Sequence, residues 1–562
     1  MDIEKLLTPN ILHDDPGSDV MWTRVNVGEA IPGTVTPLTA DFQRPANLYP
    51  AGRMYHRMGL LAQPVIPEFG GTQMTCFFCG KMAINLDTLR WLMDRTPGIT
   101  ADEFEASILG NVRDNVVSRP YRLRYPIAFV KIAWLVKTLP AENANLGRTT
   151  TNWWKSKTET LKHANIEESL KIFAEARNVY ESVIDHAGLV ASLSPAFMAQ
   201  LARPVEKLGS QEDVLTIASG FGNVKETEML DRLWRVAKNE ESLEKFLTDY
   251  GYMCPSGAEL ESLSWRENNN LLNQILEVNA SAPENERPTA RFKKTQQRAT
   301  KRKAELLSNA SVLTKTEFRI GYWFASRLIP IREVGKACMF MAPDVGRAAA
   351  RNVGRYLLNK GSITCVDDVF YLSYEEIMSS TQHSDQYGEV VAERRELRRQ
   401  YDQIELPDFF TSEQLREIIW TFAKNRNRGD QSDNATPIAH PGDVIEGAAA
   451  SPGKVTGRAR VISDPSNTDG FSKGDILICK VTDPGWAALF SIAGALVADV
   501  GGMLSHSAII AREIGIPAVV NTRNGTRRIP DGAIVTVDGA SGTVTIEGDE
   551  LALLNKHSNS SA

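Results

Sequence analysis

Apolar residues recur every three to four positions over most of the chain between residues 100 and 425, which predicts a domain built mainly of α-helices. Two of the patterns, 166–186 and 224–250, also alternate charges in the manner of exposed amphipathic helices. The clear helical patterns run near 102–113, 166–186, 192–207, 224–250, 288–309, 315–327, 331–359 and 386–403.

The hydrophobic pattern is different before this region. Residues 22–39 are rich in Thr, Pro and Gly, and they predict an extended segment with turns, part of an irregular region over about 20–90. Its polar residues Arg24, Glu29 and Thr36 either line a ligand pocket or form a satisfied polar network that braces a loop. The aromatic and Met residues over 45–90 fit a core or an apolar substrate pocket equally well.

A polar stretch with Gly, Pro and Asn, residues 425–441, predicts a flexible linker. Fully extended, it reaches at most about 55–60 Å. Residues 442–550 then alternate short β segments, glycine turns and two helices, which is typical of a compact β/α domain. We therefore expect a multi-domain protein: a mainly helical domain over 1–424, the linker, the β/α domain, and a tail over 551–562.

The second half of the β/α domain contains a strand–turn–helix–strand pattern. An apolar run to Val497 is followed by Gly501 and Gly502, a helical pattern from His506, and a second strand at 518–520. The start of a helix suits a phosphate group, and glycine lets the backbone approach an anion closely. Ser505 is placed to cap the helix or to donate to phosphate, and a neutral His506 is placed to accept a phosphoryl group. A capped helix whose histidine faces solvent fits the same pattern.

A second chemical pattern lies in the helical region, from Arg327 to Lys336. Arg332 and Lys336 are four residues apart, so a helix places both cations on one face, where an anion such as a phosphoryl group relieves their repulsion. Glu333 is placed to orient a cation or to act as a base, and Arg327 is placed to approach the same face. An ordinary surface patch paired with acidic residues is the alternative.

Net charge, cysteine pattern and the length of apolar runs bear on which ligands and which location to expect. A net charge of −6 and a pI of about 5.9 give no electrostatic case for nucleic acid or an anionic membrane. Cys76 and Cys79 have no second metal-binding pair and are expected to be buried structural thiols, so we expect no metal site. The start of the chain lacks the pattern of a signal peptide and no apolar run has membrane-spanning length, so the expected location is the cytoplasm.

Residues 498–520 closely resemble the phosphohistidine segment of the swivelling domain in phosphoenolpyruvate-utilising enzymes. This group includes phosphoenolpyruvate synthase, pyruvate phosphate dikinase and rifampin phosphotransferase. The resemblance implies that His506 is the phosphocarrier and that Gly501, Gly502 and Ser505 hold the phosphate. It extends over 450–457, 473–478, 482–486 and 530–539.

The helical region resembles the acceptor-binding domain of rifampin phosphotransferase and its relatives. Residues 327–336 are similar to its arginine–glutamate–lysine segment, although Val334 and Gly335 stand where relatives carry an aromatic residue or proline. The resemblance implies that Arg332, Lys336 and Glu333 act in catalysis. Residues 22–39 resemble the opening of that domain, which makes its polar residues and Arg327 candidates for an acceptor pocket.

No Walker A sequence occurs in the chain, and no stretch resembles the ATP-binding domain that usually accompanies the swivelling domain. We therefore expect ATP and Mg²⁺ to be held by a partner subunit of the ATP-grasp type. In size and layout the chain is similar to the larger subunit of phenylphosphate synthase and of alkylphenol (cresol) phosphorylating enzymes. This implies phosphoryl transfer to a phenolic hydroxyl, with ATP converted to AMP and inorganic phosphate. An antibiotic or other hydroxyl phosphotransferase of the rifampin type, or a non-catalytic phosphocarrier, are the alternatives.

Overall fold

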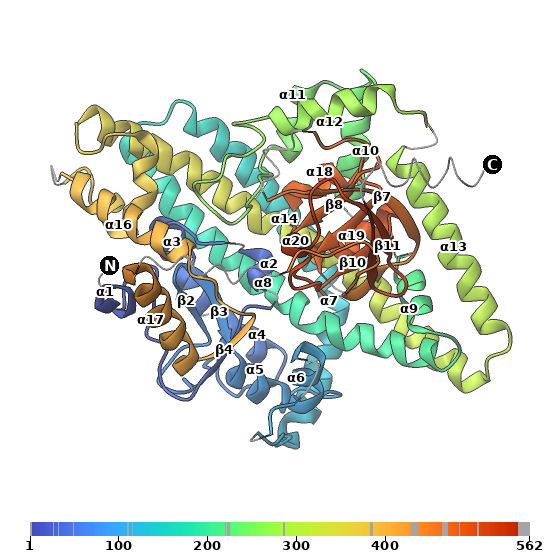
Figure 1. The fold of residues 1–562 in the computed structure, drawn as a ribbon. Helices are drawn as coiled ribbons and strands as arrows, with labels where there is room; N and C mark the ends of the chain where they lie inside the picture. Colours follow the sequence, from blue (N-terminus) through green and yellow to red (C-terminus); the bar gives the residue numbers. More distant parts are fainter. Residues whose placement is uncertain are drawn as a thin grey trace. The chain divides into compact units, whose positions relative to one another are not determined.

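The computed structural model divides the chain into two compact units (Figure 1). The first unit holds Met1–Ala196, Ala258–Ser262 and Val334–Asp433, and the second holds Phe197–Gly257, Leu263–Glu333 and Asn434–Ala562. The structure describes residues 3–25, 27–31, 33–48, 50–109, 112–114, 116–219, 221, 225–284, 287–382, 386–428, 437–463, 470–482, 484–502 and 505–548.

The first unit contains a four-stranded antiparallel sheet in the order β2-β3-β1-β4. Its strands are β1 (Met21–Thr23), β2 (Thr75–Phe78), β3 (Lys81–Asn85) and β4 (Phe409–Thr411). Cys79 and Gly80 form the two-residue turn between β2 and β3, with φ of 51° and 68°, as a tight hairpin requires. Cys76 and Cys79 are free and buried, which confirms the prediction of structural thiols.

Long helices make up most of the rest of the first unit. The helix α7 (Tyr125–Leu161) runs beside the part of α14 (Val312–Asn359) that belongs to this unit, and the Trp154 indole N–H donates to Asp344 at 2.7 Å. The other helices are α1 (Ile3–Leu7), α2 (Val27–Ala30), α3 (Pro37–Leu48), α4 (Pro50–Arg57), α5 (Leu86–Met93), α6 (Ala101–Leu109), α15 (Tyr374–Met378), α16 (Gly388–Asp402) and α17 (Ser412–Arg428). Short 3₁₀ helices occur at η1 (Arg122–Arg124) and η3 (Val366–Tyr371).

Two predictions for this unit need correction. Residues 37–57 form α3 and α4 instead of the irregular structure predicted over about 20–90, and α3 begins at Pro37, a favoured first position of a helix. The sequence patterns also missed α7, in which a polar stretch and the internal Pro140 hide the periodicity. Ser373 and Glu376 form a capping box at the start of α15, because each backbone N–H donates to the other side chain.

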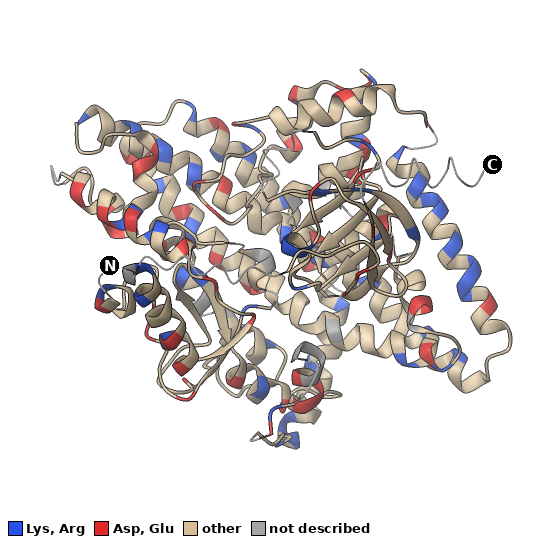
Figure 2. Ribbon diagram, viewed as in Figure 1, with Lys and Arg blue, Asp and Glu red and all other residues tan. Residues whose placement is uncertain are grey.

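The second unit begins within α8 (Ile166–Glu206), which starts in the first unit. Its helices are α9 (Gln211–Ala218), α10 (Lys225–Ala237), α11 (Leu243–Tyr250), α12 (Asn270–Ser281), α13 (Pro288–Ser308) and the part of α14 up to Glu333. The helix α13 has Lys and Arg residues along most of its length, coloured blue on the ribbon in Figure 2. It contacts α19, the helix that begins at His506.

An eight-stranded mixed sheet, in the order β5-β12-β11-β7-β8-β9-β10-β6, completes the second unit. The four strands from β7 to β10 run parallel to one another, and the remaining neighbours pair antiparallel. A large helical region together with a β/α sheet domain confirms the predicted fold class. The strands are β5 (Val444–Glu446), β6 (Ala448–Ser451), β7 (Lys454–Val461), β8 (Ile476–Cys479), β9 (Ala495–Ala498), β10 (Ala518–Val520), β11 (Ile534–Asp538) and β12 (Thr543–Gly548), with helices η4 (Pro484–Trp486), α18 (Ala487–Phe490), α19 (His506–Ile514) and α20 (Gly525–Arg528).

The predicted linker at 425–441 begins inside α17, which continues to Arg428. Residues 429–436 lie outside the described part of the chain, and so does the predicted tail at 551–562. At the far end of the linker, buried Ala439 donates its N–H to Arg528 O at 2.8 Å, so this residue already packs on the sheet domain. Among the described helices, none has both the length and the apolar character needed to cross a bilayer.

Candidate phosphoryl-transfer site

The predicted strand–helix–strand unit is present and lies in the parallel part of the larger sheet. Strand β9 leads through Gly501 and Gly502 into α19, and β10 then pairs parallel to β9, with Ala518 opposite Leu496. Gly515 ends α19 with φ of 78°, the left-handed conformation that glycine adopts without strain. The start of α19 therefore lies at the carboxyl edge of the parallel strands, where α/β sheets bind ligands.

The conformation of the turn before α19 accounts for the glycine at position 501 and the serine at position 505. Gly501 has φ of +142°, and a Cβ added there would lie 3.1 Å from Ser505 Oγ. Buried Ser505 caps the helix, because its Oγ accepts from the Ala508 N–H at 3.2 Å. Its Oγ also lies 2.9 Å from Ser507 Oγ. The Ser505 hydroxyl is thus engaged in local structure, while Gly502 is exposed with nothing within 4 Å of an added Cβ.

His506 is the first residue of α19. Its side chain lies outside the described part of the structure, as do all atoms of Met503 and Leu504. The first turn of a helix carries backbone N–H groups without intrahelical partners, and the positive end of the helix dipole lies there. The backbone thus places His506 where a phosphoryl group is favoured, and its role as the carrier remains a prediction.

Two cations follow the neighbouring strands at the same edge of the sheet, and the sequence analysis did not single them out. Exposed Lys480 comes directly after β8, and exposed Arg523 comes three residues after β10. The Arg523 N–H donates to Asp499 O at 3.0 Å, just after β9, and Arg523 itself has φ of 65°. In the sequence, each of these cations follows a short apolar run. That position indicates a shared edge of the sheet only when the order of the strands is known.

On α14, the predicted triad lies in one uninterrupted helix, so the four-residue spacing of Arg332 and Lys336 holds. Arg332 and Lys336 are half-buried. Glu333 is 2% exposed, and neither of its carboxyl oxygens has a hydrogen-bond partner in the described structure. A buried carboxyl group without a partner is costly, which is the pattern expected of a group kept for chemistry.

Two further charged residues, Arg512 and Glu513, are buried on α19 within the second unit. The pKa of Arg512 is lowered to about 10, mainly by burial; the charge of Glu513 opposes this shift, and the charge of Arg332 adds to it. Burial raises the pKa of Glu513 to about 8; Arg512 opposes this shift and Glu333 adds to it. Arg512 also donates to Ala450 O at 2.7 Å. Arg332 and Glu333 of α14 thus interact electrostatically with α19, the helix that begins at His506.

Among the residues predicted to line an acceptor pocket, Arg24 and Thr36 of the first unit take part in polar networks. Buried Arg24 donates to Leu406 O at 3.3 Å, and burial lowers its pKa, although Asp408 opposes the shift. Thr36 donates from its hydroxyl to Glu259 at 2.7 Å and from its backbone N–H to the same carboxylate at 3.0 Å. These contacts brace a loop, which is the alternative that the sequence left open.

The side chain of Glu29, in α2, lies outside the described part of the structure. Arg327, in the second unit, is exposed, and its guanidinium lies 4.6 Å from the centroid of the Trp323 ring. An acceptor role for Arg24, Glu29, Thr36 and Arg327 stays a prediction.

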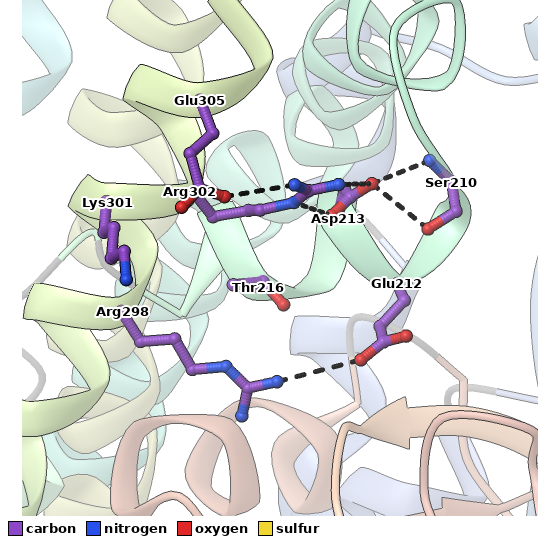
Figure 3. A pocket seen from close by; sticks show the side chains of 8 residues that line it. All are labelled: Ser210, Glu212, Asp213, Thr216, Arg298, Lys301, Arg302 and Glu305. Atoms are coloured by element: carbon purple, nitrogen blue, oxygen red, sulfur yellow. Dashed lines mark hydrogen bonds and ion pairs between the residues drawn. The ribbon is translucent and has the colours of Figure 1, made fainter.

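A pocket of about 370 Å³ lies between α9 and α13 in the second unit. Figure 3 shows that most of its charges are paired: Arg302 contacts both Asp213 and Glu305, and Arg298 contacts Glu212. With three basic and three acidic side chains, the pocket has no net charge to attract a phosphate. Its lining residues are Ser210, Glu212, Asp213, Thr216, Arg298, Lys301, Arg302 and Glu305. In the described part of the chain, no three His, Cys, Asp or Glu side chains are grouped to hold a metal ion.

Comparison with known proteins gives two family matches. Residues 471–542 match the mobile domain of PEP-utilising enzymes, which includes the start of α19. Residues 238–333 match the fourth domain of rifampicin phosphotransferase, and this match ends on Arg332 and Glu333. The two groups of residues that the sequence analysis selected for chemistry therefore fall in these two domains, apart from Lys336.

Three curated relatives show how much of the chain is shared. A protein of Bacillus subtilis (strain 168) named an uncharacterized phosphotransferase is 30% identical over 342 residues, which are 58% of this chain and 39% of that protein. Rifampicin phosphotransferase of Streptomyces sviceus is 31% identical over 334 residues, 58% of this chain and 37% of the relative. A probable phosphoenolpyruvate synthase of Staphylothermus marinus is 40% identical over 152 residues, 26% of this chain and 18% of the relative.

The chain thus spans about two fifths of the length of the two longer matches. The resemblance inferred from the sequence is confirmed at the level of domains: the chain carries the mobile domain of the PEP-utilising enzymes together with a domain of the rifampicin phosphotransferase type.

Proposed function

We propose that this chain is a phosphotransferase that carries a phosphoryl group on His506 to the hydroxyl of a small phenolic acceptor. The group comes from ATP, which is held with Mg²⁺ by a separate nucleotide-binding polypeptide of the ATP-grasp type. The observation that carries the proposal is the position of His506 at the start of α19, at the carboxyl edge of four parallel strands, within the matched mobile domain.

The proposed reaction has two halves. In the first, ATP and one water molecule react so that one phosphoryl group is left on the His506 imidazole, and AMP and inorganic phosphate are released. In the second, the acceptor oxygen attacks phosphorus, the bond between phosphorus and the imidazole nitrogen breaks, and the hydroxyl proton is lost. Dividing the transfer at a histidine replaces one difficult step by two easier ones.

Residues of α14 are proposed to assist the second half of the reaction, the transfer from His506 to the acceptor. Arg332 and Lys336 are cations on one helix face, and cations beside a transferring phosphoryl group stabilise the charge on its equatorial oxygens. Glu333 has two carboxyl oxygens without a described partner, which suits it to accept the acceptor's proton or to orient one of the cations. A phenol requires only modest help because its hydroxyl is comparatively acidic.

A second acceptor class is an antibiotic hydroxyl. It is favoured by the match of residues 238–333 to the fourth domain of rifampicin phosphotransferase and by the relative of that name. The two candidates share the carrier and the cations of α14, and they differ only in what the acceptor domain binds.

One experiment separates these functions. The chain is incubated with its candidate nucleotide-binding partner, ATP and Mg²⁺, and with phenol, 4-cresol or rifampicin in parallel. We expect AMP and an aryl phosphate to form in equal amounts with a phenol. Phosphorylated rifampicin as the main product would show that the acceptor is an antibiotic hydroxyl and not a phenol. Phosphorylation of His506 without turnover of any acceptor would indicate a non-catalytic phosphocarrier.

A further inference from the structure

A row of large apolar side chains lies uncovered on the first part of α7, in the first unit. Ile127, Val130 and Trp134 are 45%, 71% and 59% exposed, and Leu123, in the 3₁₀ turn just before α7, is 77% exposed. Ile127, Val130 and Trp134 are spaced by three and four residues within α7, which places these three on one helix face, and Leu123 precedes the helix. We call Leu123, Ile127, Val130 and Trp134 the α7 stripe.

The stripe is separate from the face that holds α7 in the first unit. Ala128, Leu135 and Leu139 are at most 1% exposed and form that buried face. Two contacts near the stripe fix the start of the helix further: Lys131 donates to His56 O at 3.2 Å, and Arg124 donates to Gly59 O at 2.9 Å. The stripe is therefore a preformed surface that the unit's own core does not use.

The sequence segment that contains the stripe carries only positively charged side chains. From Val116 to Ala141 the sequence contains no Asp or Glu, but it contains five cations: Arg119, Arg122, Arg124, Lys131 and Lys137. None of the five forms an ion pair with a carboxylate in the described part of the chain. Arg113, just before this segment, is by contrast paired with both Asp87 and Glu105.

We propose that the α7 stripe docks an amphipathic helix of a second polypeptide whose apolar seam is flanked by Asp and Glu. Within α7, the spacings of three and four residues between Ile127, Val130 and Trp134 are those of the a and d positions of a coiled coil. Lys131 then occupies an e position, where interhelical ion pairs form. Apolar knobs from a partner helix would cover the stripe, and its carboxylates would neutralise the cations beside it. This inference does not depend on the phosphoryl-transfer proposal.

The spacing within α7 fits a partner helix, and the cations fit its acidic residues. Phe129, which is 61% exposed, extends the apolar face on one side of the stripe, with its ring 6.2 Å from that of Tyr125 in an edge-on arrangement. Lys131 lies beside the stripe, and Lys137, seven residues after Val130, occupies the next d position at its end. A lipid surface is the alternative occupant, and a binding measurement with vesicles separates the two.

The test uses the full-length chain and a fluorescent synthetic heptad peptide with Leu at a and d and Glu at e and g. The peptide is kept below the concentration at which it self-associates, and binding is followed by fluorescence anisotropy. We expect Trp134→Glu and Val130→Glu to weaken binding by about tenfold or more, which corresponds to the loss of a central apolar contact. Trp420→Glu, which changes a 47% exposed tryptophan of α17 in the same unit, should leave binding unchanged.

Charge reversal provides the second arm. Lys131→Glu and Lys137→Glu should weaken binding of the Glu-flanked peptide and strengthen binding of an otherwise identical Lys-flanked peptide. Circular dichroism verifies that each variant is folded. Equal binding of the two peptides to the wild-type chain, or binding that Trp134→Glu does not change, would overturn the proposal. So would a Trp134-dependent dimer of the chain, or Trp134-dependent binding to phosphatidylserine vesicles in place of the peptide.

Discussion

Glu513 of α19 and Glu333 of α14 are two buried carboxyl groups that repel each other within the second unit. Both Glu333 oxygens and one Glu513 oxygen have no hydrogen-bond partner among the described residues. The helix that begins at His506 and the helix that carries Arg332 are thus linked by buried charges. Burial favours the protonated form of Glu513, and the charge of Glu333 adds to this effect.

The first prediction concerns the pH dependence of stability. Burial raises the pKa of Glu513 from 4.5 to about 8 in the folded chain, so the folded state holds this proton more tightly than the unfolded state. The proton on Glu513 therefore adds to the free energy of unfolding. This contribution is fully present below the pKa of the unfolded state and is lost as the pH rises through the pKa of the folded state. The free energy of unfolding changes by at most about 1.4 kcal/mol per pH unit for this one group. We expect Glu513→Gln to make the free energy of unfolding, measured in urea, less dependent on pH between about 5 and 8.

Glu446→Gln is the control for that series, because Glu446 is an exposed carboxylate of the same sheet domain. It should keep the wild-type slope. Identical slopes for the wild-type chain and Glu513→Gln would show that Glu513 is already ionised in the folded state.

The second prediction contrasts two adjacent glycines. Gly501→Ala places a Cβ 3.1 Å from Ser505 Oγ at a φ of +142° and should cost about 1–3 kcal/mol. Gly502→Ala meets nothing within 4 Å and should change stability by no more than about 0.5 kcal/mol. Thermal unfolding measures both. If the two variants were equally stable, the turn would not have the strained conformation described here.

The third prediction separates the two roles of Ser505. Ser505→Ala removes the acceptor for the Ala508 N–H and should destabilise the chain by about 1 kcal/mol. Ser505→Asp restores a capping oxygen and should recover that stability, but its negative charge should reduce phosphorylation of His506. Recovery of both stability and phosphorylation in Ser505→Asp would argue against a phosphate at this helix start.

The fourth prediction tests Arg332 in the second half of the reaction. Arg332→Ala should permit phosphorylation of His506 and slow transfer to the acceptor by about 10²–10³-fold, as the loss of a charge-stabilising group does in other enzymes. Arg319→Ala is the matched control, since Arg319 is an exposed arginine of the same helix with no proposed role. Single-turnover measurements on the phosphorylated chain give the rate. An equal loss in both variants would place Arg332 outside the transfer step.

The sequence predicted best where local signals were strong. The helical pattern at 288–309 is observed as α13, Pro288–Ser308, and the strand–helix–strand unit around His506 has nearly the predicted bounds. There, apolar runs, paired glycines and a capping serine all favour the same local structure.

Prediction failed where tertiary packing decides. The patterns at 315–327 and 331–359 are one helix, α14, which continues through Pro330 although proline removes a backbone hydrogen bond. Arg512 and Glu513 gave no signal as a buried pair, because their burial depends on elements distant in the sequence. Thr36 was ambiguous for the same reason: its partner, Glu259, is 223 residues away.

The most direct test of the central claim is to locate a phosphoryl group on the chain. The full-length chain and its His506→Ala variant are treated with potassium phosphoramidate, and in parallel with ATP, Mg²⁺ and the candidate partner. Electron-transfer fragmentation mass spectrometry at neutral pH then locates any acid-labile phosphate. The account predicts phosphohistidine at position 506 that disappears when a competent acceptor is added. Phosphate on other histidines alone, or a phosphohistidine at 506 that no hydroxyl acceptor discharges, would contradict it.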